Sequence, residues 1–149
     1  MSRLRQLYEA MILEHNRNPR NFRVISECSH SSHGKNPLCG DDFYVFVKLN
    51  EGVIVDISFH GYGCAISKSS GSLMTECLLG KTVTEALAYK DLFIKLVTQE
   101  LQETEKQQLG KLTIFEGVKS FPVRVKCAAL VWRALEDALE NNAGEVTTE

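Results

Sequence analysis

The sequence has no long hydrophobic run and no surplus of charge of one sign. Its longest continuous apolar run is Cys127 to Trp132, far short of the roughly 20 residues that a membrane-spanning helix needs. Lysine and arginine total 17 and aspartate and glutamate total 19, which gives a net charge of −2. Proteins that bind nucleic acid usually carry a basic surplus. We therefore expect neither a membrane protein nor a nucleic-acid-binding protein.

The sequence also lacks a secretory signal and a paired Cys-x-x-Cys motif. Residues 1–5 lead into a charged amphipathic stretch and not into the apolar core of a signal peptide, so we expect a cytoplasmic protein. Its five cysteines are an odd number. In a reducing compartment they predict metal ligands or reactive thiols rather than a disulfide framework. The 149 residues, 44% of them hydrophobic, suffice for one folded domain, 1–149, without disulfides.

Hydrophobic periodicity predicts a helix and then a β-hairpin in the first half of the chain. Apolar residues recur at helical spacing over 3–16, whereas 22–38 is polar and irregular. Strict alternation over 43–49 and again over 53–59, on either side of a turn, predicts an antiparallel hairpin with one buried face. In the second run the alternation places four side chains on that face: Val53, Val55, Ile57 and Phe59.

The second half of the chain predicts helices. An apolar stripe over 66–77 indicates one helix, and Thr82 with Glu85 forms a capping-box pattern that opens another. Residues 99–111 lose this periodicity, which indicates a solvated helix extension or a loop. Pro122 suits the first turn of a last helix, and we expect a frayed tail over 141–149. The predicted fold class is α+β, with helices packed on a small antiparallel sheet of about three strands.

Three cysteines and one aspartate occupy positions typical of a binding site. Cys39 lies in a tight turn before the first hairpin strand, and Asp41 follows two residues later. Cys64 lies where a strand gives way to a helix, whose N-terminus favours the thiolate. Cys127 lies in the early turns of the last helix. Three thiolates and a carboxylate suit zinc or an iron–sulfur cluster.

These residues also have simpler interpretations. The three cysteines are 25 and 63 residues apart, so no local metal motif links them, and cysteine is often an inert buried residue. Asp41 alone is typical of a turn or cap. The cluster of Cys28, His30 and His33 has a spacing that suits a metal, although polar loops of this composition are common.

Several spaced motifs resemble the IscU/NifU-like iron–sulfur assembly proteins, and specifically their SufU branch. The resemblance covers about residues 4–140, and its matching segments are Leu7–His15, Asn18–Phe22, Asn36–Asp41, Gly61–Ser67 and Phe121–Cys127. IscU proteins have a histidine where this chain has Lys126, and a Leu-Pro-Pro-Val-Lys segment where it reads Phe121–Val125. The polar segment around 99–113 is similar to the insertion that separates SufU from IscU.

The resemblance implies a compact α+β fold and a function in sulfur transfer. It implies a zinc site made by Cys39, Asp41, Cys64 and Cys127. It implies a partner, a pyridoxal-phosphate cysteine desulfurase of the SufS type, whose persulfide passes sulfur to Cys39 for relay to downstream iron–sulfur assembly proteins. Arg124 and Lys126 flank Cys127, and we expect these cations to favour an anionic persulfide and to help dock the partner.

Three other functions use the same residues. The chain would be a scaffold if a [2Fe–2S] cluster assembled on the same Cys and Asp ligands, with iron in place of zinc. It would be a structural zinc module if the metal only stabilised the fold. It would be a cysteine hydrolase if Cys39 or Cys64 were a nucleophile, but no histidine lies near either cysteine in a way that suggests a general base.

Overall fold

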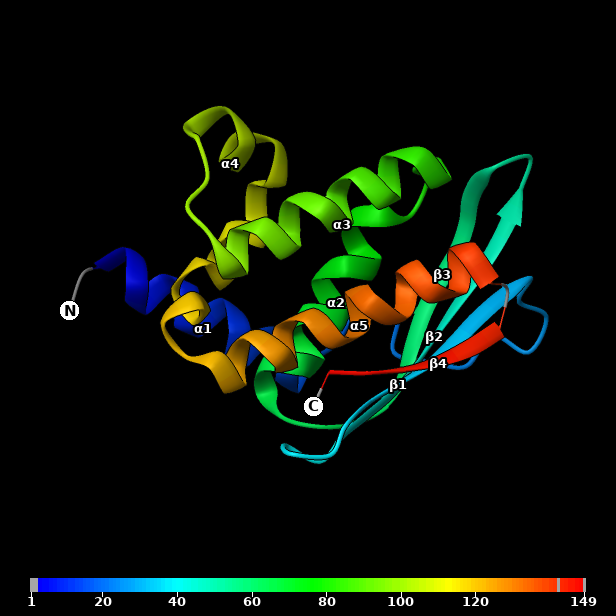
Figure 1. Cartoon of the computed structure of the whole chain (residues 1–149), viewed down its shortest axis with the longest axis horizontal. Coiled ribbons are helices and arrows are strands. Elements are labelled where there is room, and N and C mark those ends of the chain that lie inside the picture. Colours follow the sequence, from blue (N-terminus) through cyan, green and yellow to red (C-terminus); the bar gives the residue numbers. More distant parts are fainter. Residues whose placement is uncertain (1–2, 142, 149) are drawn as a thin grey trace.

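The computed structural model describes residues 3–141 and 143–148. A β-sheet forms one side of the molecule and helices cover one of its faces (Figure 1). The predicted α+β class is confirmed. In chain order the elements are α1 (Arg3–Arg17), β1 (His30–Asn36), β2 (Asp41–Asn50), β3 (Val53–Tyr62), α2 (Ala65–Leu78), α3 (Val83–Thr98), α4 (Glu103–Leu109), the 3₁₀ helix η1 (Gly110–Ser120), α5 (Pro122–Asn141) and β4 (Ala143–Thr147).

The sheet has four strands in the order β3-β2-β1-β4, not the expected three. The β1–β2 and β2–β3 pairs are antiparallel, whereas β4 runs parallel to β1. Thus residues 143–147 form an edge strand where we expected a frayed tail. Strand β1 falls in the segment expected to be irregular, because its buried positions are Ser32, Gly34 and Asn36. A strand with polar or small residues on its inner face gives no hydrophobic alternation.

The predicted hairpin is present as β2 and β3, but one of its predicted inward residues is wrong. The register between the two strands shifts between Lys48 and Leu49. On β3 this bulge falls at Val55, which is 47% exposed, while the preceding Ile54 is fully buried. A bulge adds one residue to one strand and so reverses which side chains face inward beyond it. Simple alternation therefore fails at Val55.

Helices α2 and α5 form the core against the sheet. Helix α5 packs on β1, β2 and β4, and α2 packs on α5 and β3 (Figure 1). Trp132 of α5 is fully buried and stacks on Phe93 at a ring-centroid distance of 4.7 Å. Its indole N–H donates to Ser70 Oγ of α2 at 3.2 Å. As predicted, α5 begins at Pro122 and the Thr82–Glu85 capping box opens α3.

The polar segment after residue 98 is helical and partly buried. Helix α4 and η1 follow one another, and η1 packs against α3. Phe115 is fully buried and meets Phe93 edge-to-face at 5.6 Å between ring centroids. The sequence pattern did not distinguish a helix from a loop in this segment, because a 3₁₀ helix does not repeat at the period of an α-helix. Among the helices described, none is both long enough and apolar enough to cross a membrane.

His15 connects α1 to α2 in the interior. Its ring is 5% exposed, and its Nδ1 lies 2.7 Å from Ser72 Oγ, which also accepts the backbone N–H of Arg20 at 2.8 Å. A Ser72 hydroxyl that accepts from Arg20 still has a proton to donate, and a neutral His15 ring can accept it at Nδ1. Burial lowers the pKa of His15 below its ordinary value, and the charge of Arg20 adds to this effect.

We expect acid to destabilise the protein through His15. Since the folded-state pKa is lowered, the unfolded chain binds a proton at a higher pH than the folded one. The stabilising contribution is complete above about pH 6.5 and is lost as the pH falls toward the folded-state pKa. A His15→Gln variant should lose part of this dependence between about pH 7 and pH 5, measured by urea unfolding of metal-free protein. The exposed His60→Gln variant is the control; equal dependence in both variants would contradict the assignment.

Candidate metal centre

Cys39 is carried on the turn that joins β1 to β2. Its backbone N–H donates to the carbonyl of Asn36 at 3.2 Å, which closes the turn. Gly40 follows with a φ of 72°, a conformation that glycine adopts without strain. Leu38 is 67% exposed and Cys39 is half-buried. The thiol therefore lies at the surface on a turn held at both ends by strands.

Asp41 links the start of β2 to the start of α2. It is 2% exposed, and its Oδ1 accepts the backbone N–H of Cys64 at 2.9 Å and the hydroxyl of Ser67 at 3.1 Å. Its second oxygen, Oδ2, lies 3.9 Å from Cys64 Sγ. One carboxylate oxygen is thus anchored while the other faces the thiol. Asp41 is both a structural link between two elements and a candidate ligand.

Cys64 is the N-cap of α2. Its backbone is extended, with φ −74° and ψ 169°, and its Sγ accepts the backbone N–H of Ser67 at 3.5 Å. The interior space here is tight. A Cβ atom on Gly63 would lie 2.6 Å from Asp41 Oδ1 and 2.7 Å from both Ser67 Oγ and the Phe43 ring. Glycine at position 63 therefore allows the strand to approach Asp41 and α2.

Cys127 completes the cluster from α5, in its second turn. It is 2% exposed. Ligand atoms of Cys39, Asp41 and Cys127 all lie within 4.8 Å of one another. Cys64 adjoins this group through Asp41, whose Oδ2 lies 3.9 Å from Cys64 Sγ. The structure thus brings three of the four predicted ligands, Cys39, Asp41 and Cys127, to metal-ligand spacing, whereas Cys64 lies beside Asp41 and outside that group.

The four groups interact electrostatically. The hydrogen bond from Cys127 lowers the pKa of Cys64 to about 6, with help from Ser67 and against the effect of burial. The same interaction raises the pKa of Cys127, because its S–H donates to the Cys64 sulfur. The Cys127 proton is therefore harder to remove than the Cys64 proton. A metal ion that takes both sulfurs must release the Cys127 proton.

The donor set fits a soft or borderline metal ion. Thiolates bind zinc and iron strongly, and one carboxylate oxygen is compatible with either. Four negative groups exceed the two positive charges of Zn²⁺, so hydrogen-bond donors and cations nearby favour the site. The Cys/Asp cluster can hold a metal, and the chemistry of the donors does not select between zinc and iron.

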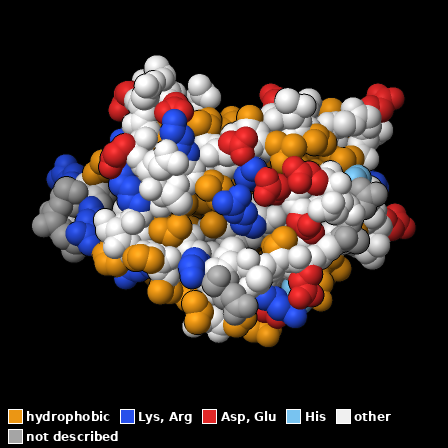
Figure 2. Space-filling model, viewed as in Figure 1, with side chains coloured by type: hydrophobic (Ala, Val, Ile, Leu, Met, Phe, Trp, Pro, Cys, Tyr) orange, Lys and Arg blue, Asp and Glu red, His pale blue; other side chains and the backbone are white. Residues whose placement is uncertain are grey.

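Arg124 lies at the first turn of α5, beside an apolar groove. Its guanidinium stacks over Phe121 at 4.4 Å from the ring centroid. The groove has a volume of about 800 Å³ and is lined by residues of α1, the start of α2, η1 and the start of α5. Figure 2 shows hydrophobic side chains gathered over the η1–α5 junction, where Phe121 and Val123 are exposed. Lys126 is half-buried, and its carbonyl accepts the Thr148 hydroxyl at 3.2 Å.

The second cluster predicted from the sequence has structural contacts of its own. His33 Nε2 lies 2.5 Å from Asp42 Oδ1, and the His33 ring stacks on Tyr44. His30 contacts the Ser29 hydroxyl at 2.9 Å. In the described part of the chain, Cys28, His30 and His33 are not gathered into a group with metal-ligand spacing.

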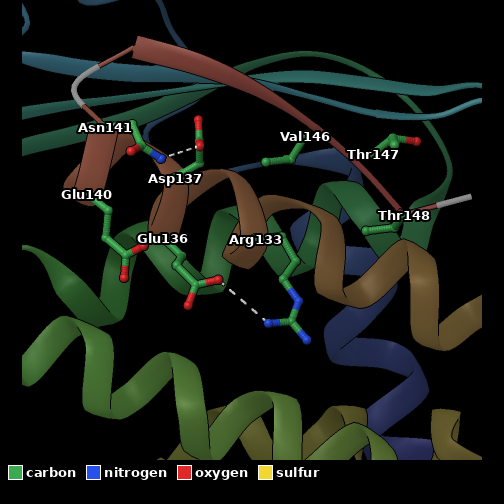
Figure 3. Close-up of a pocket in the computed structure, with 8 residues that line it drawn as sticks. All are labelled: Arg133, Glu136, Asp137, Glu140, Asn141, Val146, Thr147 and Thr148. Carbon is green, nitrogen blue, oxygen red and sulfur yellow. Dashed lines mark hydrogen bonds and ion pairs between the residues drawn. The ribbon is translucent and has the colours of Figure 1, made fainter.

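A smaller cavity of about 400 Å³ lies between α5 and β4 (Figure 3). Arg133, Glu136 and Asp137 line it from α5, and Val146 and Thr148 line it from the last segment. Arg133 pairs with Glu136 at 3.6 Å, while Asn141 donates to Asp137 at 2.8 Å. None of the cavity's lining residues belongs to the Cys/Asp cluster.

Two residues that sequence reasoning missed support the cluster. Ser67 is fully buried and contacts both Asp41 and Cys64. Its place three residues after an N-cap is a signal that was available in the sequence. Asn36 is fully buried, and its Nδ2 donates to Cys127 Sγ at 3.7 Å. Its partner is 91 residues away, so no local pattern could have identified it.

The chain matches one protein-family model, described as the NifU-like N terminal domain, over residues 7–128. It is 37% identical over 143 residues to a protein of Streptococcus pyogenes serotype M1 named iron–sulfur cluster assembly scaffold protein IscU, covering 96% of this chain and 89% of the relative. It is 36% identical over 138 residues to the zinc-dependent sulfurtransferase SufU of Bacillus subtilis (strain 168), covering 93% and 92%.

A solved structure has the same fold. The crystal structure of a protein from Fervidobacterium islandicum AW-1, titled as an iron–sulfur cluster assembly scaffold for the SUF system, superposes with a TM-score of 0.82 at 34% identity. The match covers 91% of this chain and 98% of that one. The arrangement of sheet and helices is therefore common to this chain and that relative.

Proposed function

This chain belongs to the family of NifU-like N-terminal domains, and on that premise we propose that it is an iron–sulfur cluster assembly protein. Its specific role is that of a zinc-dependent sulfur acceptor. It takes persulfide sulfur from a pyridoxal-phosphate cysteine desulfurase of the SufS type and relays it to downstream assembly proteins in the cytoplasm. The metal ligands are Cys39, Asp41, Cys64 and Cys127, and Cys39 accepts the sulfur.

The observation that carries this proposal is the difference between the three thiols. Cys127 is buried in α5 and Cys64 is fixed as the N-cap of α2, whereas Cys39 lies on an exposed turn next to Leu38. A partner's reactive group can approach Cys39 without unfolding any element. The two other cysteines and Asp41 are held by hydrogen bonds from within the fold.

Sulfur transfer at Cys39 is a thiol–persulfide exchange. The Cys39 thiolate attacks the outer sulfur of the desulfurase persulfide, the S–S bond breaks, and the desulfurase cysteine leaves as a thiolate. Cys39 then carries the persulfide. A bound zinc ion supplies one contribution, because it keeps its thiol ligands deprotonated at neutral pH. Arg124 and Lys126 precede Cys127 on α5. Arg124 also borders the apolar groove, where the partner is proposed to dock.

A second function shares this site. The relative from Streptococcus pyogenes is named as a scaffold, and iron binds to the same kinds of ligand as zinc. On that alternative a [2Fe–2S] cluster assembles on the three cysteines and Asp41. A lysine stands at position 126, where the resembling IscU proteins have histidine, and this favours the sulfur-acceptor role.

Metal content and desulfurase stimulation, measured on one anaerobically purified sample, separate the two functions. We expect one zinc per chain and a large increase in the turnover of a SufS-type desulfurase. Iron with acid-labile sulfide and little stimulation would establish the scaffold instead. A protein that unfolds when its zinc is removed and does not affect the desulfurase would be a structural zinc module.

A further inference from the structure

We propose that Asn36 is a positioning residue of the metal centre, whose side-chain amide holds the Cys127 sulfur and tunes it by hydrogen bonding. The inference rests on the proposed function, because it takes the Cys/Asp cluster to hold a metal. It adds a residue that is not itself a ligand.

Asn36 contacts three of the four candidate ligands. It is the last residue of β1 and is fully buried. Its Nδ2 donates to Cys127 Sγ at 3.7 Å, and its carbonyl accepts the Cys39 N–H at 3.2 Å. Across the β1–β2 pair its register partner is Asp41. One residue therefore fixes the distance between the Cys39 turn, the start of β2 and helix α5.

Packing alone does not account for an amide at this position. Within residues 3–141 and 143–148, no donor reaches the buried Oδ1 of Asn36. A buried polar atom without a partner is unfavourable, and an apolar side chain of similar size would avoid that penalty. The contact of Nδ2 with a sulfur supplies a reason for the amide, because a leucine there would donate nothing to Cys127.

Donation to a thiolate matters because this ligand set is rich in negative charge. Three thiolates and one carboxylate would surround an ion of two positive charges. An N–H···S hydrogen bond withdraws electron density from the sulfur and reduces the repulsion among the ligands. The Asn36 amide is neutral, so it does so without a full charge in the buried interior.

Cobalt(II) is a suitable probe, because its sulfur-to-metal charge-transfer band reports on the electron density of the thiolates. In the full-length protein we compare Asn36→Ala and Asn36→Asp, both of which lose the N–H donor, with the unchanged chain. The control is Ser58→Ala, since Ser58 Oγ is also fully buried and has no hydrogen-bond partner among the described residues. We expect cobalt affinity to fall about 10–100-fold in both Asn36 variants and the band to move to lower energy, with neither change in the control.

The outcomes separate this inference from the proposed function. An unchanged chain that binds no cobalt would overturn both. If the unchanged chain and both Asn36 variants bind cobalt equally well, the inference alone is overturned. The same holds if the Asn36 variants bind cobalt more weakly but their charge-transfer band does not move. It also holds if Ser58→Ala loses as much cobalt affinity as the Asn36 variants. If the Asn36 variants do not fold, NMR of the unchanged chain tests the inference instead. A side-chain amide proton of Asn36 must shift when zinc binds, and an unmoved signal would overturn the inference.

Discussion

Replacing Cys39 by alanine should abolish sulfur transfer to this chain if the proposed function is correct. Desulfurase turnover should then fall to the rate that the desulfurase has by itself. The physical reason is that the nucleophile is removed while the rest of the site stays anchored. Asp41 and Cys64 keep their hydrogen bonds to each other and to Ser67. The protein should therefore remain folded. The measurements are desulfurase turnover, and transfer of labelled sulfur from cysteine to the chain.

The matched control is Cys28→Ala. Cys28 is also a half-buried thiol, but it lies outside the cluster, so its loss should leave turnover and labelling unchanged. Folding of both variants is checked by circular dichroism. A folded Cys39→Ala protein that still stimulates the desulfurase fully would end the assignment of Cys39 as acceptor.

Replacing Gly63 by alanine should disrupt the metal centre through one methyl group. The added Cβ would lie 2.6 Å from Asp41 Oδ1 and 2.7 Å from Ser67 Oγ and the Phe43 ring. Phe43 is fully buried, so Asp41 and Ser67 must move. We expect zinc affinity to fall about 10–100-fold and the free energy of unfolding to fall by about 1–3 kcal/mol. Zinc competition with a chelator and urea unfolding measure the two effects.

Gly117→Ala is the matched control for this variant. Among the residues that the structure describes, none would lie within 4 Å of a Cβ atom at Gly117, so the same chemical change meets open space there. Zinc affinity and stability should then stay close to those of the unchanged chain. If Gly63→Ala behaves like Gly117→Ala, the close approach at Gly63 does not constrain the site.

Elements with a local signal could be predicted from the sequence. The start of α3 follows from the reciprocal hydrogen bonds that Thr82 and Glu85 make three residues apart. The start of α5 follows from Pro122, which lacks an N–H that a first turn does not use. In both cases the interaction lies within one turn of helix, so the pattern contains it.

Elements held by distant partners could not be predicted. Strand β1 places Ser32, Gly34 and Asn36 inward because α5 approaches closely there, and a Cβ at Gly34 would lie 3.1 Å from Leu130. Strand β4 exists because it pairs with β1, more than 100 residues earlier. Neither strand has alternating apolar residues, which is the signal that sequence reasoning uses.

The candidate site lies between these cases. The glycine-rich turns around Cys39 and Cys64 and the helix at Cys127 identify three unusual cysteines. Their positions suggested a set of four with Asp41, although no local spacing motif joined them, and the family resemblance then implied that this set is a zinc site. The structure adds the reason for their convergence, since Asp41 bonds to the start of α2 and Asn36 bonds to Cys127 of α5. These contacts form only in the folded chain.

The separation of the ligands along the chain sets an order of events during synthesis. Cys39, Asp41 and Cys64 leave the ribosome before Cys127, which follows Cys64 by 63 residues. At a translation rate of roughly 5–20 residues per second, three of the four candidate ligands are present without the fourth for several seconds. Helix α5, which covers β1 and β2 and contributes Trp132 to the core, is also absent during that interval. The four candidate ligands can therefore meet only after α5 has been synthesised and has packed against β1 and β2.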